Sequence, residues 1–303
     1  MEKFFSNKKN AIIMGIIAMI LWGSAVPLIK LTYEHLNIES FDTGSKILVA
    51  GIRFFMAGIL SFVYFYLINK KTNKLQIDKK LNIRIILLFA TFQTFLQYFF
   101  YYIGLSNTAG SKASVIQASN AFFSVILAII LIKDEKLTLR KVLALIIGTL
   151  GILIVNFNGL NQFTFKITGE GFVIIATLFG AIANVFLRKY GKEYNSFSLT
   201  ASQFILGSIP LILIGVVSHN AKFNFDITLF FLLLYGAFIS ATAFCLWTLV
   251  LKYNQASEFS IYKLFIPIFG TIFSIIFLKD PLTIRIILGL VFVLIGSRIL
   301  NKK

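Results

Sequence analysis

The chain has 303 residues, of which 58% are hydrophobic and only 14% charged, and its mean hydropathy is +0.86. A water-soluble protein of this length needs a more polar surface, so the composition excludes a soluble globular protein. The formal net charge of +17 would suit a nucleic-acid-binding protein, but the positions of the basic residues, described below, argue against that function.

Long apolar runs predict ten helices that cross a membrane, because about 20 helical residues span about 30 Å of hydrocarbon. The runs are continuous and lack the alternation over about 10 residues that membrane strands show, which excludes a strand barrel. We therefore predict an all-α integral membrane protein with almost no extramembrane domain. In chain order the predicted spans are 11–29, 47–68, 85–111, 113–132, 142–165, 171–187, 195–218, 227–251, 259–278 and 282–300.

The basic residues are distributed unevenly between the two ends of these spans. Most of the 29 Lys and Arg residues fall on the same side as the N-terminus. Such a bias marks the cytoplasmic side, so both termini are predicted to be cytoplasmic. The positive charge then orients helices and contacts anionic lipid, and no nucleic-acid partner is expected.

Two segments of the chain resemble each other. Residues 111–134 read SKASVIQASNAFFSVILAIILIKD and residues 257–280 read SEFSIYKLFIPIFGTIFSIIFLKD, and a Leu-Thr-x-Arg motif follows each. Polar matches at a nearly constant register indicate an internal duplication, with repeats at 11–157 and 168–301. Each repeat holds five helices, and because five is odd, the second repeat is predicted to be inverted in the membrane. Inverted repeats are typical of secondary transporters, whose substrate site lies near the midplane between them.

The chain resembles the ten-helix EamA-type transporters of the drug/metabolite transporter superfamily. The resemblance rests on ILWGSAVPLIK in the first span, GIRFFMAGIL in the second, and the ends of both repeats. It implies a carrier of the bacterial inner membrane, often an exporter of amino acids or related metabolites. The second repeat departs from the family pattern, because Asp280-Pro281 stands where a loop glutamate is usual, whereas Glu135 keeps that glutamate in the first repeat.

Lys263 is the most unusual candidate for the substrate site, because it stands in an apolar run. It aligns with Gln117 of the first repeat, so the duplication places polar side chains at equivalent positions. If Lys263 faces a cavity, its charge suits a substrate carboxylate. The alternative is that the side chain extends to the cytoplasmic interface, because Lys263 lies only about 9 Å into its helix at 1.5 Å per residue.

Arg53 in the second span is predicted to have a structural or gating role rather than to bind substrate. Gly51 and Gly58 flank it at a spacing that implies a closely packed helix face. A helix-end carbonyl or Asp42 could pair with it. Prolines inside the first and ninth spans each remove a backbone hydrogen bond and can free a carbonyl towards a cavity; these are Pro27 and Pro267.

Other aromatic and amide residues are candidates to line the substrate path, although most aromatic residues in so apolar a chain face lipid or the interface. Amides are the stronger candidates, because an unpaired amide in lipid is costly. The candidates are Trp22, Tyr98, Tyr101, Tyr102, Asn120, Asn184, Gln203, Trp247 and Tyr262.

The sequence carries no signature of an enzyme, a metal site or a cofactor site. His35, His219 and the single Cys245 form no metal-ligand pattern. No acidic residue lies deep in a predicted span, which disfavours proton coupling through an embedded carboxylate. The leading prediction is an alternating-access carrier for a small polar metabolite, with a lipid-handling flippase component as the alternative. Its expected partners are that metabolite and lipid, and a monomer is plausible.

Overall fold

The computed structural model describes residues 2–72, 82–131, 138–156, 165–190, 194–223, 225–253, 262–263 and 265–301. Throughout these ranges the secondary structure is helical and contains no strand, which confirms the all-α prediction. Helices occur at all ten predicted spans. The loop from 133 to 137 and the first residues of the ninth predicted span, 259–261, lie outside the described ranges.

The helices follow one another with short connections. α4, η1 and α5 are continuous, and η1 is a π-helical stretch within that long helix. Up to residue 156 the elements are α1 (Glu2–Phe5), α2 (Lys8–His35), α3 (Thr43–Thr72), α4 (Ile83–Phe89), η1 (Ala90–Leu96), α5 (Gln97–Ser106), α6 (Gly110–Gln117), α7 (Ser119–Leu131) and α8 (Leu139–Asn156). They are followed by η2 (Ile167–Gly171), α9 (Phe172–Tyr190), α10 (Ser196–Ser218), α11 (Ile227–Tyr253), α13 (Phe265–Leu278) and α14 (Ile284–Asn301).

Six helical stretches in the described part of the chain are long and apolar enough to cross a membrane. They are Lys8–His35, Thr43–Ile68, Ile83–Ser106, Ile167–Leu187, Ser196–Ser218 and Ile227–Val250. Two further apolar helices, Phe265–Leu278 and Ile284–Gly296, are shorter. The predicted span 113–132 is not one continuous helix, because α6 ends at Gln117 and α7 begins at Ser119.

Side-chain caps explain where several helices begin. The side chain of Asn7 accepts hydrogen bonds from the backbone N–H groups of Lys9 and Asn10 at the start of α2. Asn82 and Asn195 cap α4 and α10 in the same way. These side chains satisfy N–H groups that have no acceptor within the first turn of a helix.

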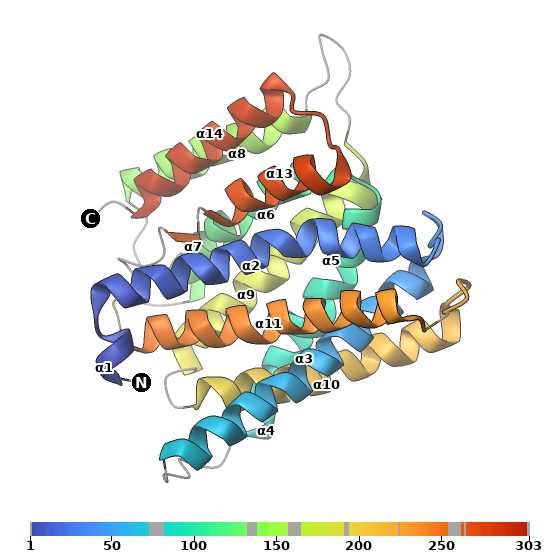
Figure 1. Cartoon of the computed structure of the whole chain (residues 1–303). Coiled ribbons are helices and arrows are strands. Elements are labelled where there is room, and N and C mark those ends of the chain that lie inside the picture. The colour runs from blue at the N-terminus through green and yellow to red at the C-terminus, as the bar shows by residue number, and fades with distance from the viewer. Residues whose placement is uncertain are drawn as a thin grey trace.

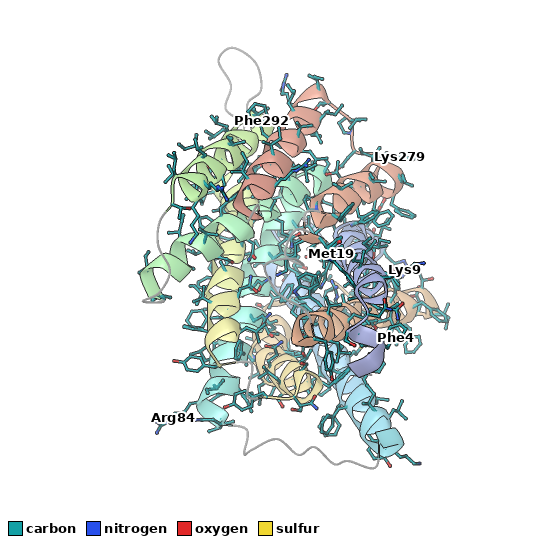
Figure 2. The ribbon with its side chains drawn as sticks, turned by 90° about the vertical axis from the view of Figure 1, so that its left-hand side faces the viewer. Phe4, Lys9, Met19, Arg84, Lys279 and Phe292 are labelled. Atoms are coloured by element: carbon teal, nitrogen blue, oxygen red, sulfur yellow. The ribbon has the colours of Figure 1, made fainter. Side chains whose placement is uncertain are left out.

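The helices lie side by side in one bundle (Figure 1). α8 pairs with α14 at one edge of the bundle, and α3 pairs with α10 towards the opposite edge. Between them, α2 packs on α13 and α11, and α9 packs on α5 and α7. Viewed end-on, Met19 of α2 lies near the centre of the bundle (Figure 2), where its side chain is fully buried.

Glycines of α3 allow the close approach of α10. A Cβ atom added to Gly51 would lie 2.7 Å from Cγ1 of Ile212, and one added to Gly58 would lie 2.6 Å from Cγ1 of Ile205. The packed face predicted from the glycine spacing is therefore the face that contacts α10. Helices that approach this closely are typical of membrane proteins, where small residues replace the hydrophobic effect as the basis of association.

Candidate functional site

Lys263 points towards α11. Its Nζ lies 5.3 Å from the centre of the Trp247 ring, a cation–π distance. Trp247 is buried and contacts Trp22 of α2 edge-on, with 6.2 Å between ring centres. Tyr262 stacks on Phe265 at the start of α13. The structure therefore brings together Lys263, Trp247 and Trp22, which come from three different predicted spans.

Arg53 is buried, with only 5% of its surface exposed, and its guanidinium group joins three helices. Nε donates to the backbone carbonyl of Gly236 at 2.9 Å, Nη1 to the Tyr102 hydroxyl at 2.9 Å, and Nη2 to Ser240 Oγ at 3.1 Å. Gly236 lies well inside α11. The carbonyl that Arg53 contacts is therefore not at a helix end, which was one of the two pairings considered from the sequence. The three bonds connect α3 to α5 and α11.

Asp42, the other partner considered for Arg53, instead caps α3. Its carboxylate accepts hydrogen bonds from Ser45 N at 3.0 Å and from Ala221 N at 2.8 Å, which ties the loop before α3 to the loop after α10. Burial favours a raised pKa for Asp42, but the hydrogen bonds from Ser45, Ala221 and Asn220 outweigh it and hold the pKa below its ordinary value. The carboxylate is therefore charged at neutral pH without Arg53.

Three candidate tyrosines lie on one face of α5, beside Arg53. Tyr98 contacts Tyr101 and Tyr102 edge-on, with 6.4 Å and 6.3 Å between ring centres. The hydroxyl of Tyr33 donates to the backbone carbonyl of Tyr102 at 2.9 Å. Tyr101 and Tyr102 are buried, and Tyr102 is completely enclosed. Tyr98, Tyr101 and Tyr102 therefore pack against one another as an aromatic layer.

Two candidate asparagines bond to each other between α7 and α9. Nδ2 of Asn184 donates to Oδ1 of Asn120 at 2.8 Å, and Nδ2 of Asn120 donates to the carbonyl of Thr177 at 2.9 Å. The side chain of Gln97 also lies beside that of Asn120, next to the backbone at Gly180. A Cβ atom added to Gly180 would lie 2.9 Å from Gln97 Oε1 and 2.8 Å from Asn120 Nδ2. Gln97 was not singled out from the sequence, although it is an amide in an apolar run.

The remaining candidates lie apart from these clusters. Gln117 is half-buried at the end of α6, and Gln203 of α10 is buried, with an Oε1 atom that accepts no hydrogen bond within the described part of the chain. Pro27 lies inside α2 as predicted. Pro267 is the third residue of α13, and residue 264, which precedes this helix, lies outside the described part of the chain.

Sequence reasoning missed two groups of charged residues near the start of α6 and the end of α2. Lys112 Nζ forms an ion pair with Glu170 at 2.7 Å, and Thr108 Oγ1 donates to the same carboxylate at 2.7 Å. A second group lines a cavity of about 320 Å³, and its charged members are Lys30, Glu34 and Asp280. In the sequence these residues are ordinary charges at the ends of apolar runs, which gives no sign that they converge.

Comparison with known proteins gives a consistent result. The profile of the EamA-like transporter family matches residues 9–157 and 167–302. An "Uncharacterized transporter" of Archaeoglobus fulgidus is 27% identical over 95% of this chain and 97% of its own length. YoaV of Bacillus subtilis, also named an uncharacterized transporter, is 24% identical over 94% of each chain.

More distant relatives agree with this result. A "WAT1-related protein" of Arabidopsis thaliana is 23% identical over 65% of this chain and 50% of its own. A solved crystal structure shares the fold, with a TM-score of 0.69 and 12% sequence identity, and the match covers 97% of both chains. Within the described residues no three His, Cys, Asp or Glu side chains gather as metal ligands. The chain belongs to the EamA-like transporter family of the drug/metabolite transporter superfamily, and it is a multi-pass membrane transporter.

Proposed function

We propose that this transporter is an alternating-access carrier of the bacterial inner membrane that exports a small polar metabolite, an amino acid or a related compound. The carrier has two inverted five-helix repeats, 11–157 and 168–301, and both termini are cytoplasmic. α1 and the C-terminal end of α14 lie at the same end of the bundle in Figure 1, which supports this orientation.

The observation that carries the proposal is the pattern of helix packing. α2, the first long helix of the first repeat, packs on α13 and α11. Its counterpart in the second repeat, α9, packs on α7 and α5. In the two repeats α7 corresponds to α13, and α5 corresponds to α11. α3 packs on its own counterpart α10, and α8 packs on its counterpart α14. This pattern is unchanged when the repeats are exchanged, as expected for two repeats related by a two-fold axis, and the odd number of helices in each repeat predicts that this axis lies in the membrane plane.

Lys263 supports a substrate with a carboxylate. Its ammonium group lies over Trp247, beside Trp22, and so faces the protein rather than lipid. Among the described residues no carboxylate pairs with this ammonium group, so an anionic group of a substrate that reaches it gains a charge-assisted hydrogen bond. We assign Lys263 to substrate binding on this basis, and Arg53 to holding α3, α5 and α11 together.

The test is counterflow in proteoliposomes that are loaded with an unlabelled amino acid and diluted into the same amino acid in labelled form. We expect labelled amino acid to accumulate in the vesicles, and we expect Lys263→Met to slow this accumulation by at least about tenfold, since one lost charged contact costs 1.4 kcal/mol or more. Protein-free vesicles and the Lys279→Met variant, which alters an exposed lysine beyond α13, are the controls. If none of the twenty amino acids exchanges, the substrate assignment is wrong, and movement of labelled lipid instead would favour the flippase function.

A further inference from the structure

A cavity of about 320 Å³ lies at the end of the bundle where α2 finishes. Its wall includes Lys30, Tyr33 and Glu34 of α2, Ser106 of α5, Leu278 of α13, and Asp280, which follows α13. Lys263 and Asp280 stand before and after α13, whose 14 residues span about 21 Å at 1.5 Å per residue. The cavity is thus at the end of the bundle opposite to Lys263, and its residues are not among the substrate-binding candidates described above.

The cavity presents charges of both signs. Lys30 is half-buried in its wall, and the Asp280 carboxylate attracts its ammonium group electrostatically, although no direct hydrogen bond or ion pair joins the Lys30 ammonium to another described side chain. Asp280 is fixed in place, because its Oδ2 accepts a hydrogen bond from the backbone N–H of Ser111 at 2.8 Å. The carboxylate of Glu34 is one helical turn beyond Lys30 on the same helix face, and it is exposed.

We propose that this cavity binds a zwitterionic α-amino acid. The substrate carboxylate contacts the Lys30 ammonium, and the substrate ammonium group lies between Glu34 and Asp280. Tyr33 and Leu278 supply apolar wall for a side chain. This inference rests on the proposed function and narrows its substrate class to compounds that carry both charges.

The chemistry of the cavity favours a zwitterion over a simple acid or amine. Cavities of about 300 Å³ and above are of the size that binds small molecules. A ligand with only a carboxylate would bring a further negative group to Glu34 and Asp280, and a ligand with only an amine would bring a second cation beside the Lys30 ammonium and compete with it for Asp280. Sites with fixed charges reject ligands that leave them unpaired, so discrimination follows from the placement of the charges.

The test is direct binding of ligand to purified protein in nanodiscs by isothermal titration calorimetry. The probes are the twenty L-amino acids and, for each one that binds, the amine that lacks its carboxylate and the acid that lacks its amino group. The variants are Lys30→Gln and Glu34→Gln, and the matched control is Lys222→Gln, which removes the same charge from an exposed residue outside the cavity. Melting of each variant is recorded first, so that loss of fold is not taken for loss of binding.

We expect at least one amino acid to bind the native protein at least about tenfold more tightly than its amine or its acid. Lys30→Gln should weaken binding of that amino acid by about tenfold or more without weakening the amine, and Lys222→Gln should change neither. If amino acids exchange across vesicles and the Lys30 and Glu34 variants bind them as the native protein does, the carrier function stands and this site is wrong. If no amino acid binds or exchanges, both proposals fail.

Discussion

Arg53 shows how a single residue can be placed from the sequence while its partners cannot. A cation in an apolar run is visible in the sequence, and burial of that cation between helices was expected because such residues rarely face lipid. Its acceptors were not foreseen, because Tyr102 is 49 positions away and Ser240 is 187 positions away. Lys263 is similar, since its contact with Trp247 depends on how α11 and α13 pack.

Arg53→Lys tests whether the guanidinium group is needed rather than only its charge. A lysine has one nitrogen and cannot reach Gly236, Tyr102 and Ser240 together. Two lost hydrogen bonds from a charged donor lower the free energy of unfolding by about 3–6 kcal/mol, at about 1.5–3 kcal/mol each. We expect a lower melting temperature for purified Arg53→Lys than for Arg298→Lys, which alters an exposed arginine of α14. Equal melting of the two variants would show that the three bonds do not hold the helices together.

The helices themselves were the most predictable elements, because each predicted span is an apolar run long enough to be recognised without any partner. The interruption between α6 and α7 was not predicted, since Ala118 has neither the missing N–H of proline nor the free backbone of glycine.

The close pairing of α3 and α10 yields a prediction from two glycine substitutions. Gly51→Ala places a Cβ atom 2.8 Å from the backbone nitrogen of Ile212 and forces the helices apart. Gly15→Ala on α2 places one in ordinary van der Waals contact, 3.9 Å from the ring of Trp247. Both substitutions favour the helix by about 1 kcal/mol through helix propensity. The difference in melting temperature between the two variants therefore reports the effect of packing alone. We expect Gly51→Ala to melt at a lower temperature than the native protein and Gly15→Ala to melt at the same temperature or higher; the reverse order would contradict the packing argument.

At the scale of the whole molecule, the duplication and the count of five helices predict the inverted plan, which stays a prediction until the faces of its loops are measured. The cavity could not be predicted, because Lys30, Glu34 and Asp280 are ordinary charges at the ends of spans until α2, α5 and α13 pack together. The sequence shows which side chains lie on each helix, whereas the packing of the helices decides which side chains of different helices become neighbours.

The inverted plan makes a topological prediction that a direct repeat would not. Lys70 follows the second span of the first repeat, and Lys222 follows the second span of the second repeat. In a Cys245→Ala background, single cysteines at these exposed positions should label from opposite faces of the membrane, position 222 from outside the cell and position 70 only after permeabilisation. Labelling of both from the same face would rule out inverted repeats.

The three hydrogen bonds of Arg53 also limit how the two proposed halves can move. α3 and α5 belong to the first half and α11 to the second, and Arg53 and Gly236 both lie inside their helices, away from either end. If the two halves rock relative to each other without breaking these hydrogen bonds, the axis of the rotation must pass close to the guanidinium group of Arg53. In such a motion the helix ends on the two sides of Arg53 move in opposite directions. The cavity beside Lys30 would then widen when the space around Lys263 narrows, and narrow when that space widens.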